Sequence, residues 1–226
     1  MAEDAQLPPD RDHSPDAELS LRERKKRATR QRISDIATPL IVARGFDNVT
    51  VTEIARAADV SAMTVFNYFP RKEDLFLDRI PEAVEMFTEA VRQRGSGETP
   101  LAAVRRLVLE LLDARHPLSG VDDDFPPFWN VVLDSPALRA RAREGVEELE
   151  TALAEALTET SAAGPGAPDP GLAAALIVAA YRSVYVTSAG RLLAGERADD
   201  IAEDHRVRVD AAFDALERAF APGRKG

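Results

Sequence analysis

The chain has 226 residues, of which 45% are hydrophobic, enough for a globular core in one large domain or in two domains. It has no cysteine, which excludes disulfides and thiolate metal sites, and its longest apolar run, residues 172–181, is too short to span a bilayer. The N-terminus is acidic and has no apolar segment of the kind found in signal peptides, so we expect a soluble cytoplasmic protein. The net charge of −10 opposes nonspecific binding to polyanions, but residues 21–80 carry twelve basic and eight acidic side chains. Only this segment suits a negatively charged partner.

The first twenty residues carry one basic and six acidic side chains, several prolines and no periodic apolar face. This composition predicts a disordered acidic tail. The tail either competes with a polyanion for the basic residues that follow it or is simply solvated.

The charge inverts after residue 20. Seven cations stand against Glu23 alone: Arg22, Arg24, Lys25, Lys26, Arg27, Arg30 and Arg32. They form either a solvated helix face or a set of phosphate contacts, and we favour phosphate because of the segment described next. An apolar stripe over residues 33–41 predicts a helix that ends at Gly45, and Pro39 predicts a kink in it.

Residues 50–72 have the pattern of two short helices joined by a tight turn. Thr50 and Glu53 have the spacing of a capping box, which predicts a helix start, and Ser61 is a good N-cap for a second helix that runs to about Phe69. Such a pair, in which one helix braces and the next enters the major groove, is a helix-turn-helix.

The outer side of the second helix predicts contact with DNA. It carries small, aromatic and amide side chains: Ala62, Met63, Thr64, Phe66, Asn67 and Tyr68. An Asn amide can pair with adenine, Thr and apolar groups can touch the thymine methyl, and a Tyr hydroxyl can donate to phosphate. Lys72, which follows Pro70, would meet the DNA backbone as a cation. The alternative is that the segment is three packed helices of another α domain.

A series of short motifs runs through residues 33–76. They include Thr50-Val51-Thr52, Ile54-Ala55, Val60-Ser61, Thr64-Val65-Phe66, Tyr68-Phe69 and Lys72-Glu73-Asp74-Leu75. In these motifs the segment resembles the DNA-binding domain of the TetR family of one-component transcriptional regulators.

The resemblance implies which residues bind DNA. Base-facing positions fall on Ala62, Met63, Thr64, Phe66 and Asn67, and phosphate-facing positions on Thr52, Tyr68 and Lys72, with Thr50 counted among the DNA-binding residues at the start of the bracing helix. Phe66 replaces the usual Tyr and lacks its hydroxyl. Arg71 replaces the usual Ser or Asn, which weakens the cap of the next helix.

Helical patterns continue to the C-terminus. A helix is expected over residues 72–80, where Pro81 either forms a hinge or lies in the first turn of a separate helix that runs to about residue 94. Residues 94–100 and 164–171 are expected to be loops. We therefore predict an all-α fold with an acidic tail (1–20), a three-helix helix-turn-helix DNA-binding domain (21–76), a larger helical ligand-binding and dimerisation domain (77–221) and a short tail (222–226).

The last two helices are expected over residues 172–193 and from about Asp199 onward. The first of them is apolar nearly all round, so every side of it must be covered. The resemblance implies a four-helix bundle between two subunits and a palindromic operator with half-sites about 34–36 Å apart. A core confined to one chain is the alternative.

Aromatic residues are scarce, at 6% of the chain, so their grouping is informative. The resemblance implies an effector pocket among the middle helices, for which the candidate lining is Met86, Phe87, His116, Phe125, Phe128, Trp129, Tyr181, Arg182 and Tyr185. Plain core packing is the alternative for each. Arg182 and His116 are candidates to orient a polar or anionic end, although Arg182 could equally pair with an acid across a dimer.

These features together predict a ligand-responsive transcriptional regulator, in our interpretation a repressor released from a palindromic operator by a small apolar effector. An activator, or a regulator without an effector, would have the same DNA-binding residues. An enzyme is not expected, because the three histidines lie far apart in the sequence and no nucleophile elbow, phosphate-binding glycine loop or metal-ligand spacing occurs. We expect neither a cofactor nor a metal, and no membrane partner.

Overall fold

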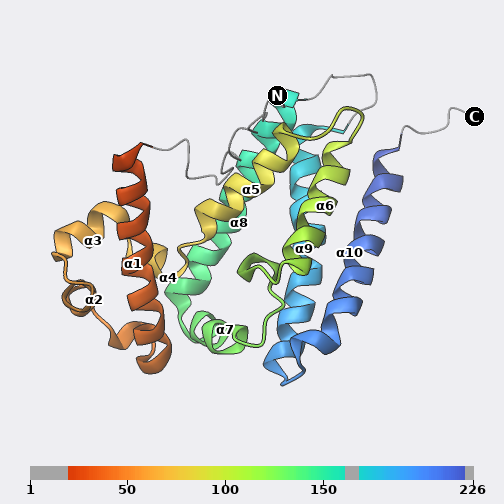
Figure 1. The fold of residues 1–226 in the computed structure, drawn as a ribbon. Coiled ribbons are helices and arrows are strands. Elements are labelled where there is room, and N and C mark those ends of the chain that lie inside the picture. Colours follow the sequence, from red (N-terminus) through yellow and green to blue (C-terminus); the bar gives the residue numbers. More distant parts are fainter. Residues whose placement is uncertain (1–19, 161–167, 222–226) are drawn as a thin grey trace, which may run out of the picture.

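The computed structural model describes residues 20–160 and 168–221, and within them every regular element is a helix. Figure 1 shows a head, made by the first four α-helices, beside a body made by the helices that follow. The α-helices are α1 (Leu21–Arg44), α2 (Val51–Ala57), α3 (Ala62–Tyr68), α4 (Lys72–Phe76), α5 (Ile80–Arg92), α6 (Pro100–Asp113), α7 (Phe125–Asp134), α8 (Pro136–Thr160), α9 (Pro170–Leu193) and α10 (Ala198–Phe220). The prediction of an all-α protein is confirmed; the predicted tails lie outside the described residues, apart from Ser20.

The first helix begins with a capping box, in which Ser20 and Glu23 each accept a backbone hydrogen bond from the other. It continues as one helix to Arg44, past Pro39, which lies on its exposed side. The proline therefore does not end α1, and the kink stays a prediction.

The predicted helix over residues 72–80 is wrong in its extent, since α4 ends at Phe76 and α5 begins at Ile80. A continuous helix would place the ring of Pro81 against the carbonyl of Leu77, four residues earlier, and would leave that carbonyl without its partner. The Leu77 carbonyl instead accepts from the N–H of Ile80 at 3.3 Å. Pro81 thus lies in the first turn of a separate helix.

The body is built around α9, which packs against α8, α10 and α7, while α5 packs on α8 and α6. By length and composition α9 is the one described helix apolar enough to cross a membrane, but core helices of soluble proteins pass the same test. Its contacts with three neighbouring helices cover part of its apolar surface, whereas Leu172, Leu176 and Val186 stay exposed.

The head and the body share a core at α7. Val131 and Val132 of α7, together with Leu138 of α8, belong to the same buried apolar cluster as Ile54 and Phe76 of the head. A second cluster joins α5, α6, α8, α9 and α10. The helix α7 is therefore packed against the head on one side and against α9 on the other.

Candidate nucleic-acid interface and its link to the body

The bracing helix α2 starts as the sequence predicts. Thr50 Oγ1 accepts from the N–H of Glu53 at 3.2 Å, and the Thr50 N–H donates to Glu53 Oε2 at 2.8 Å. Hydrogen bonds from the backbone and side chain of Thr50, and from Arg44, lower the pKa of Glu53 to about 2. The start of α2 is thus fixed by an ionised carboxylate at neutral pH.

The following helix, α3, buries one side and exposes the other. The Ser61 hydroxyl caps it by accepting from the N–H of Thr64 at 3.0 Å. Val65 is buried, whereas Met63 is 69% and Phe66 47% exposed. Two large apolar side chains exposed next to each other on one short helix indicate an interaction surface.

The other candidate DNA-binding residues lie around this surface. Thr50, Thr52 and Asn67 are exposed, and Ala62, Thr64 and Tyr68 are half-buried. The Thr64 hydroxyl is 2.8 Å from that of Ser61, so it takes part in the cap of its own helix. All nine candidate residues lie on α2, on α3 or at the ends of the short helices beside them.

Lys72 is held more firmly than a freely moving surface cation. Its Nζ donates to the carbonyl of Phe46 and lies 4.1 Å from the centre of the Phe46 ring. Burial lowers the pKa of Lys72, although Asp47 and Glu73 oppose that effect. The sequence analysis missed this partner, because no local pattern connects two residues 26 positions apart.

The basic run of α1 lies on the surface next to these helices. Its side chains are exposed from Arg22 to Arg27, whereas Arg30 is half-buried, with its guanidinium 4.4 Å from the centre of the Phe69 ring. Arg30 also donates to the backbone carbonyl of Asp78 at 3.2 Å. Arg30 therefore links the end of α3 to the segment between α4 and α5.

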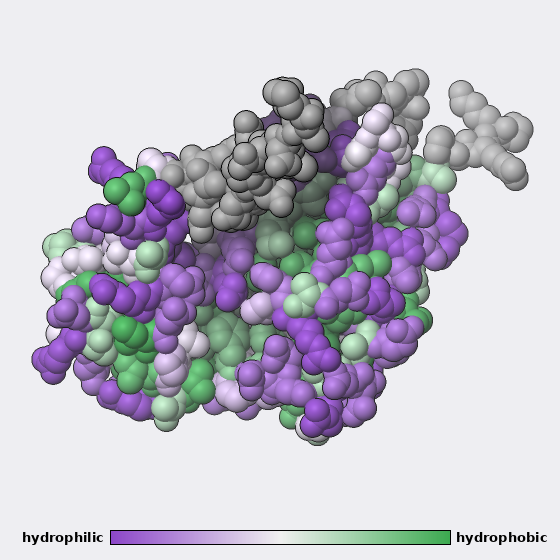
Figure 2. Space-filling view, viewed as in Figure 1, coloured by the Kyte–Doolittle hydropathy of each residue, from purple (hydrophilic) through white to green (hydrophobic). Residues whose placement is uncertain are grey.

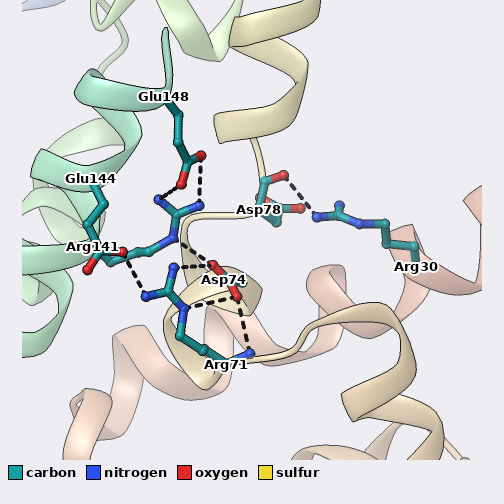
Figure 3. Close-up of polar contacts among 7 residues, drawn as sticks. All are labelled: Arg30, Arg71, Asp74, Asp78, Arg141, Glu144 and Glu148. Atoms are coloured by element: carbon teal, nitrogen blue, oxygen red, sulfur yellow. Dashed lines mark hydrogen bonds and ion pairs between the residues drawn. The ribbon is translucent and has the colours of Figure 1, made fainter. Parts of the chain in front are cut away.

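A network of ionised side chains joins the head to α8 (Figure 3). Arg141 of α8 donates from Nε to Asp74 Oδ1 of α4 at 2.6 Å, and its Nη1 lies 3.0 Å from Glu148 Oε1. Arg71 also donates to Asp74, at 3.4 Å, and to Glu144, at 2.7 Å. Burial acts to raise the pKa of Asp74, but the hydrogen bonds from Arg141 and Arg71 outweigh it and hold that pKa below its usual value.

Arg71 was expected to weaken the start of α4, and its own side chain provides no cap. The cap comes instead from Asp74, whose carboxylate accepts from the N–H of Arg71 at 3.1 Å. Asp74 thus both caps the start of α4 and pairs with Arg141.

Two further contacts fix the segment between α4 and α5. Ser34 of α1 donates to Asp78 Oδ2 at 2.5 Å, and burial raises the pKa of Asp78 despite this hydrogen bond. On the other side, Gly145 of α8 leaves room for Ile80, because a Cβ at position 145 would lie 2.7 Å from Ile80 Cδ1. Movement of this segment must therefore disturb both α1 and α8.

A continuous series of aromatic contacts runs from the head into the body. Phe76 of α4 stacks on Phe128 of α7 with ring centres 4.7 Å apart and an interplanar angle of 12°. Phe128 contacts Trp129 at 6.2 Å, and Trp129 contacts Tyr185 of α9 at 5.9 Å. From Tyr185 the series continues to Tyr181 at 6.3 Å.

Other predicted lining residues join this series. Phe125 contacts Phe128, Trp129 and Tyr185, while Phe87 of α5 lies 6.0 Å from Tyr181. Met86 packs against the body core near Phe87. Six of the nine candidate lining residues therefore form one connected group of rings.

The remaining two candidates, His116 and Arg182, are not part of that group. His116 is half-buried, with Nδ1 accepting from the N–H of Leu118 at 3.2 Å and Nε2 3.5 Å from Glu82. Arg182 is exposed, although its neighbour Tyr181 is buried. Neither of these two side chains is among the rings.

A buried polar pair, missed by the sequence analysis, lies at the far end of the rings. His205 of α10 is fully buried, its Nδ1 is 2.8 Å from the Ser188 hydroxyl, and its ring centre is 6.3 Å from that of Tyr181. Burial lowers the pKa of His205 to about 4. Its place on the buried side of α10, one helical turn from Ile201 and Val209, was the signal that the sequence offered.

The face of the molecule seen in Figure 2 is mostly hydrophilic. Figure 2 shows hydrophilic residues over much of the face viewed there, with hydrophobic ones in smaller groups between them. Two open hollows of about 610 and 480 Å³ lie along α8, lined largely by glutamates between Glu144 and Glu159. Both hollows lie away from the rings, which pack on one another. In the described part of the chain, no group of three or more His, Asp or Glu residues is placed to hold a metal ion.

Comparison with known proteins finds similar sequences over the head and over most of the chain. Residues 33–78 match the model of "Bacterial regulatory proteins, tetR family". Over 215 residues the chain is 33% identical to the HTH-type transcriptional regulator TcmR of Streptomyces glaucescens, covering 91% of this chain and 90% of TcmR. Transcriptional regulators of this kind are not enzymes.

Solved structures are similar over nearly the whole chain. The repressor FadR of Thermus thermophilus, solved in complex with lauroyl-CoA, is 25% identical, with a TM-score of 0.52, over 87% of this chain and all of FadR. A regulator from Streptomyces coelicolor A3 is 21% identical, with a TM-score of 0.50, over 89% of this chain and 98% of that one. At that identity the second similarity concerns the fold alone.

Proposed function

The chain belongs to the TetR family of bacterial transcriptional regulators, and we propose that it acts as a homodimeric, cytoplasmic repressor that leaves a palindromic operator when an apolar effector enters the body. The observation that carries this proposal is the exposed side of α3. Met63, Phe66 and Asn67 point outward from a short capped helix, which suits base edges and thymine methyl groups better than it suits water.

DNA contact through this surface also fits the charge. Residues 21–80, which hold the basic run of α1, carry twelve basic and eight acidic side chains, whereas the segments before and after them are acidic, so the head is the part that a duplex attracts. The nine candidate residues of α2, α3 and Lys72 would share base reading and phosphate contact between them. In this arrangement Lys72 approaches the phosphate from its position against Phe46.

Dimer formation is proposed from the outer sides of α9 and α10. Leu172, Leu176 and Val186 of α9 are exposed in the single chain, as is Val207 of α10. On α9 these residues recur at helical spacing, so a second copy could cover them with the same surface. Two heads held in this way would meet half-sites one turn of DNA apart, about 34–36 Å.

Release by an effector is proposed from the rings. Phe76 of the head is stacked on Phe128, so any molecule that separates α7 from α9 also acts on α4. The related FadR of T. thermophilus was solved with lauroyl-CoA, an acyl-type ligand. An effector must bind the released conformation better than the DNA-bound one, and a coupling of about 1–3 kcal/mol would give roughly 5- to 150-fold control.

A second candidate is a regulator with the same head but without an effector. The close packing of the rings favours it, since the two hollows described above lie along α8 and not beside Trp129. Entry of an effector therefore requires ring contacts to open.

Retention of genomic fragments by the full-length protein tests the proposal. The wild-type chain should retain a small set of fragments, and protection from nuclease should show two symmetric half-sites in each. A Phe66→Ala/Asn67→Ala double variant should lose this selection, whereas Arg106→Ala, an exposed change on α6, should keep it. Equal retention of all fragments by the wild type would overturn the proposal.

A further inference from the structure

Two buried nitrogen atoms near the aromatic series have no hydrogen-bond partner among the described residues. They are Nε1 of Trp129 and Nε2 of His205. The Trp129 N–H lies near the Tyr185 hydroxyl, but it forms no hydrogen bond of normal geometry with that group. Buried polar groups are nearly always paired, because an unpaired one loses its bonds to water without replacement. Two such atoms in one region therefore require an explanation.

Part of the same series of rings connects the two nitrogens, with Trp129 inside the series and His205 at its far end. Trp129 contacts Tyr185 at 5.9 Å, Tyr185 contacts Tyr181 at 6.3 Å, and Tyr181 contacts His205 at 6.3 Å. The rings that lie between them, those of Tyr185 and Tyr181, have apolar faces. A molecule that replaced these contacts would have an apolar or aromatic middle and a polar group at each end.

The surroundings of the rings indicate that this molecule is uncharged. Both cation–π contacts of the described residues lie in the head, at Phe69 and Phe46. Arg182 is exposed, and Arg206, next to His205, is paired with Asp113. A buried anion without a cation would be costly, whereas a hydroxyl or carbonyl needs only a hydrogen bond.

The hydrogen bond between His205 and Ser188 prepares the imidazole for this role. With Nδ1 engaged at 2.8 Å by the Ser188 hydroxyl, the ring is fixed in orientation and Nε2 is left for another partner. Depending on the tautomer, Nε2 donates or accepts, so a hydroxyl group suits it in either case. Trp129 can only donate, and it therefore suits an oxygen acceptor.

We infer that His205 and Trp129 recognise the two polar ends of the effector, and that the effector is an elongated, uncharged molecule with an apolar, ring-bearing middle and an oxygen at each end. This inference rests on the proposed function, because it assigns the chemistry of the same effector region. It adds His205 to the candidate lining and removes Arg182 from it.

The test compares three probes on the full-length protein. The probes are trans-stilbene, its para,para′-dihydroxy derivative and lauroyl-CoA, which represent an apolar rod, the same rod with two polar ends, and an anionic acyl chain. Affinity is measured by calorimetry and, where Trp129 is present, by quenching of its fluorescence, since it is the only tryptophan of the chain. The dihydroxy compound should bind about tenfold or more tightly than trans-stilbene, and it should release operator DNA.

Variants at the two ends separate recognition from packing. His205→Leu and Trp129→Phe remove the polar atoms but keep apolar side chains of similar size, and each should reduce the preference for the dihydroxy compound by about fivefold to tenfold. Binding of trans-stilbene should persist in both. Arg182→Ala is the matched control and should leave all three affinities unchanged.

Each other outcome overturns the inference in a recognisable way. The role of His205 and Trp129 is refuted if the wild-type protein binds the two stilbenes equally well or binds neither. It is also refuted if both variants keep the full preference for the dihydroxy compound over trans-stilbene. Tighter binding of lauroyl-CoA, weakened by Arg182→Ala, would assign the region to an anionic effector and leave the proposed function standing. Failure of the wild-type protein to select any DNA sequence would instead refute the proposed function.

Discussion

Arg141 of the body and Asp74 of the head are joined by a hydrogen bond of 2.6 Å, although the Arg141 side chain is only 7% exposed. A guanidinium in such a place needs carboxylates around it, and Asp74 and Glu148 supply them. Because Asp74 also caps α4, this contact fixes the first turn of the helix that connects the DNA-binding residues to the body.

Replacement of Arg141 by Met should therefore destabilise the protein. Breaking a buried ion pair by removing one partner costs about 3–5 kcal/mol. We expect a smaller loss here, about 2–3 kcal/mol, because the partly buried Asp74 keeps its ion pair with Arg71. Unfolding in urea, followed by circular dichroism, measures the loss.

Arg143→Met is the control for this change, since Arg143 is exposed on the same helix and its loss should cost less than about 0.5 kcal/mol. Equal stability of the two variants would show that Arg141 does not stabilise the contact between head and body.

Replacement of Lys72 by Ala should weaken binding to every duplex by a similar factor. Loss of one phosphate contact should also reduce the slope of log affinity against log salt by about 1. Gel-shift titrations at several salt concentrations measure both effects. The fold should persist, because the contact of Lys72 with the Phe46 ring contributes about 0.5–1 kcal/mol and its hydrogen bond to the Phe46 carbonyl at most about 1.5–3 kcal/mol, less than the stability of a typical domain. An unchanged salt slope would exclude Lys72 from the phosphate contacts.

A charge in the middle of the outer face of α9 should separate the subunits. Val186 is 58% exposed in the single chain, and Val186→Glu would bury two carboxylates at a symmetric interface. We expect the dissociation constant of the dimer to rise by at least about a hundredfold, which sedimentation measures. Leu133→Glu places the same charge on an exposed leucine of α7 and should leave the dimer intact. A Val186→Glu protein that remains dimeric would locate the interface elsewhere.

The buried His205 should make stability depend on pH in a defined window. Its pKa is about 4 in the folded protein because burial disfavours the charged form, whereas an unfolded histidine titrates near 6.5. The unfolded chain therefore binds the proton first as pH falls, and folding is weakened progressively between about pH 6.5 and 4. This residue alone should account for up to about 3 kcal/mol, with full stability above pH 6.5.

Comparison with His205→Leu isolates that effect from the titration of carboxylates, which both proteins share. The difference in free energy of unfolding between the two proteins should change through this window and be constant above it. Ser188→Ala keeps the imidazole and should keep the window. A difference that does not vary with pH would mean that His205 is not buried in its neutral form.

The sequence predicted the helices well where local rules decide them. Capping by Thr50 and Ser61 and the apolar spacing of Ile54 and Val65 are properties of neighbouring residues, and the structure places α2 and α3 accordingly. The end of α4 was predicted four residues late, because the clash between Pro81 and the Leu77 carbonyl acts over the preceding turn.

The contacts between distant segments were not predictable in the same way. Arg141 meets Asp74, and His205 meets Ser188, only because α8 and α10 are brought to α4 and α9 by packing of the whole body. Charged and polar residues are common along all of these helices, so the sequence pattern alone did not identify these two pairs. Because aromatic residues are scarce in this chain, their clustering in the sequence predicted that the rings lie together. The sequence did not predict that Arg182 is exposed.

The most direct test of DNA reading by α3 is the effect of Asn67→Ala on a complete set of single-base variants of the selected half-site. If Asn67 pairs with a base, as we propose, the variant should lose about 1–3 kcal/mol of discrimination at one base pair and keep it at all others. Discrimination that is unchanged at every position, or reduced equally at all of them, would contradict the placement of α3 in the major groove.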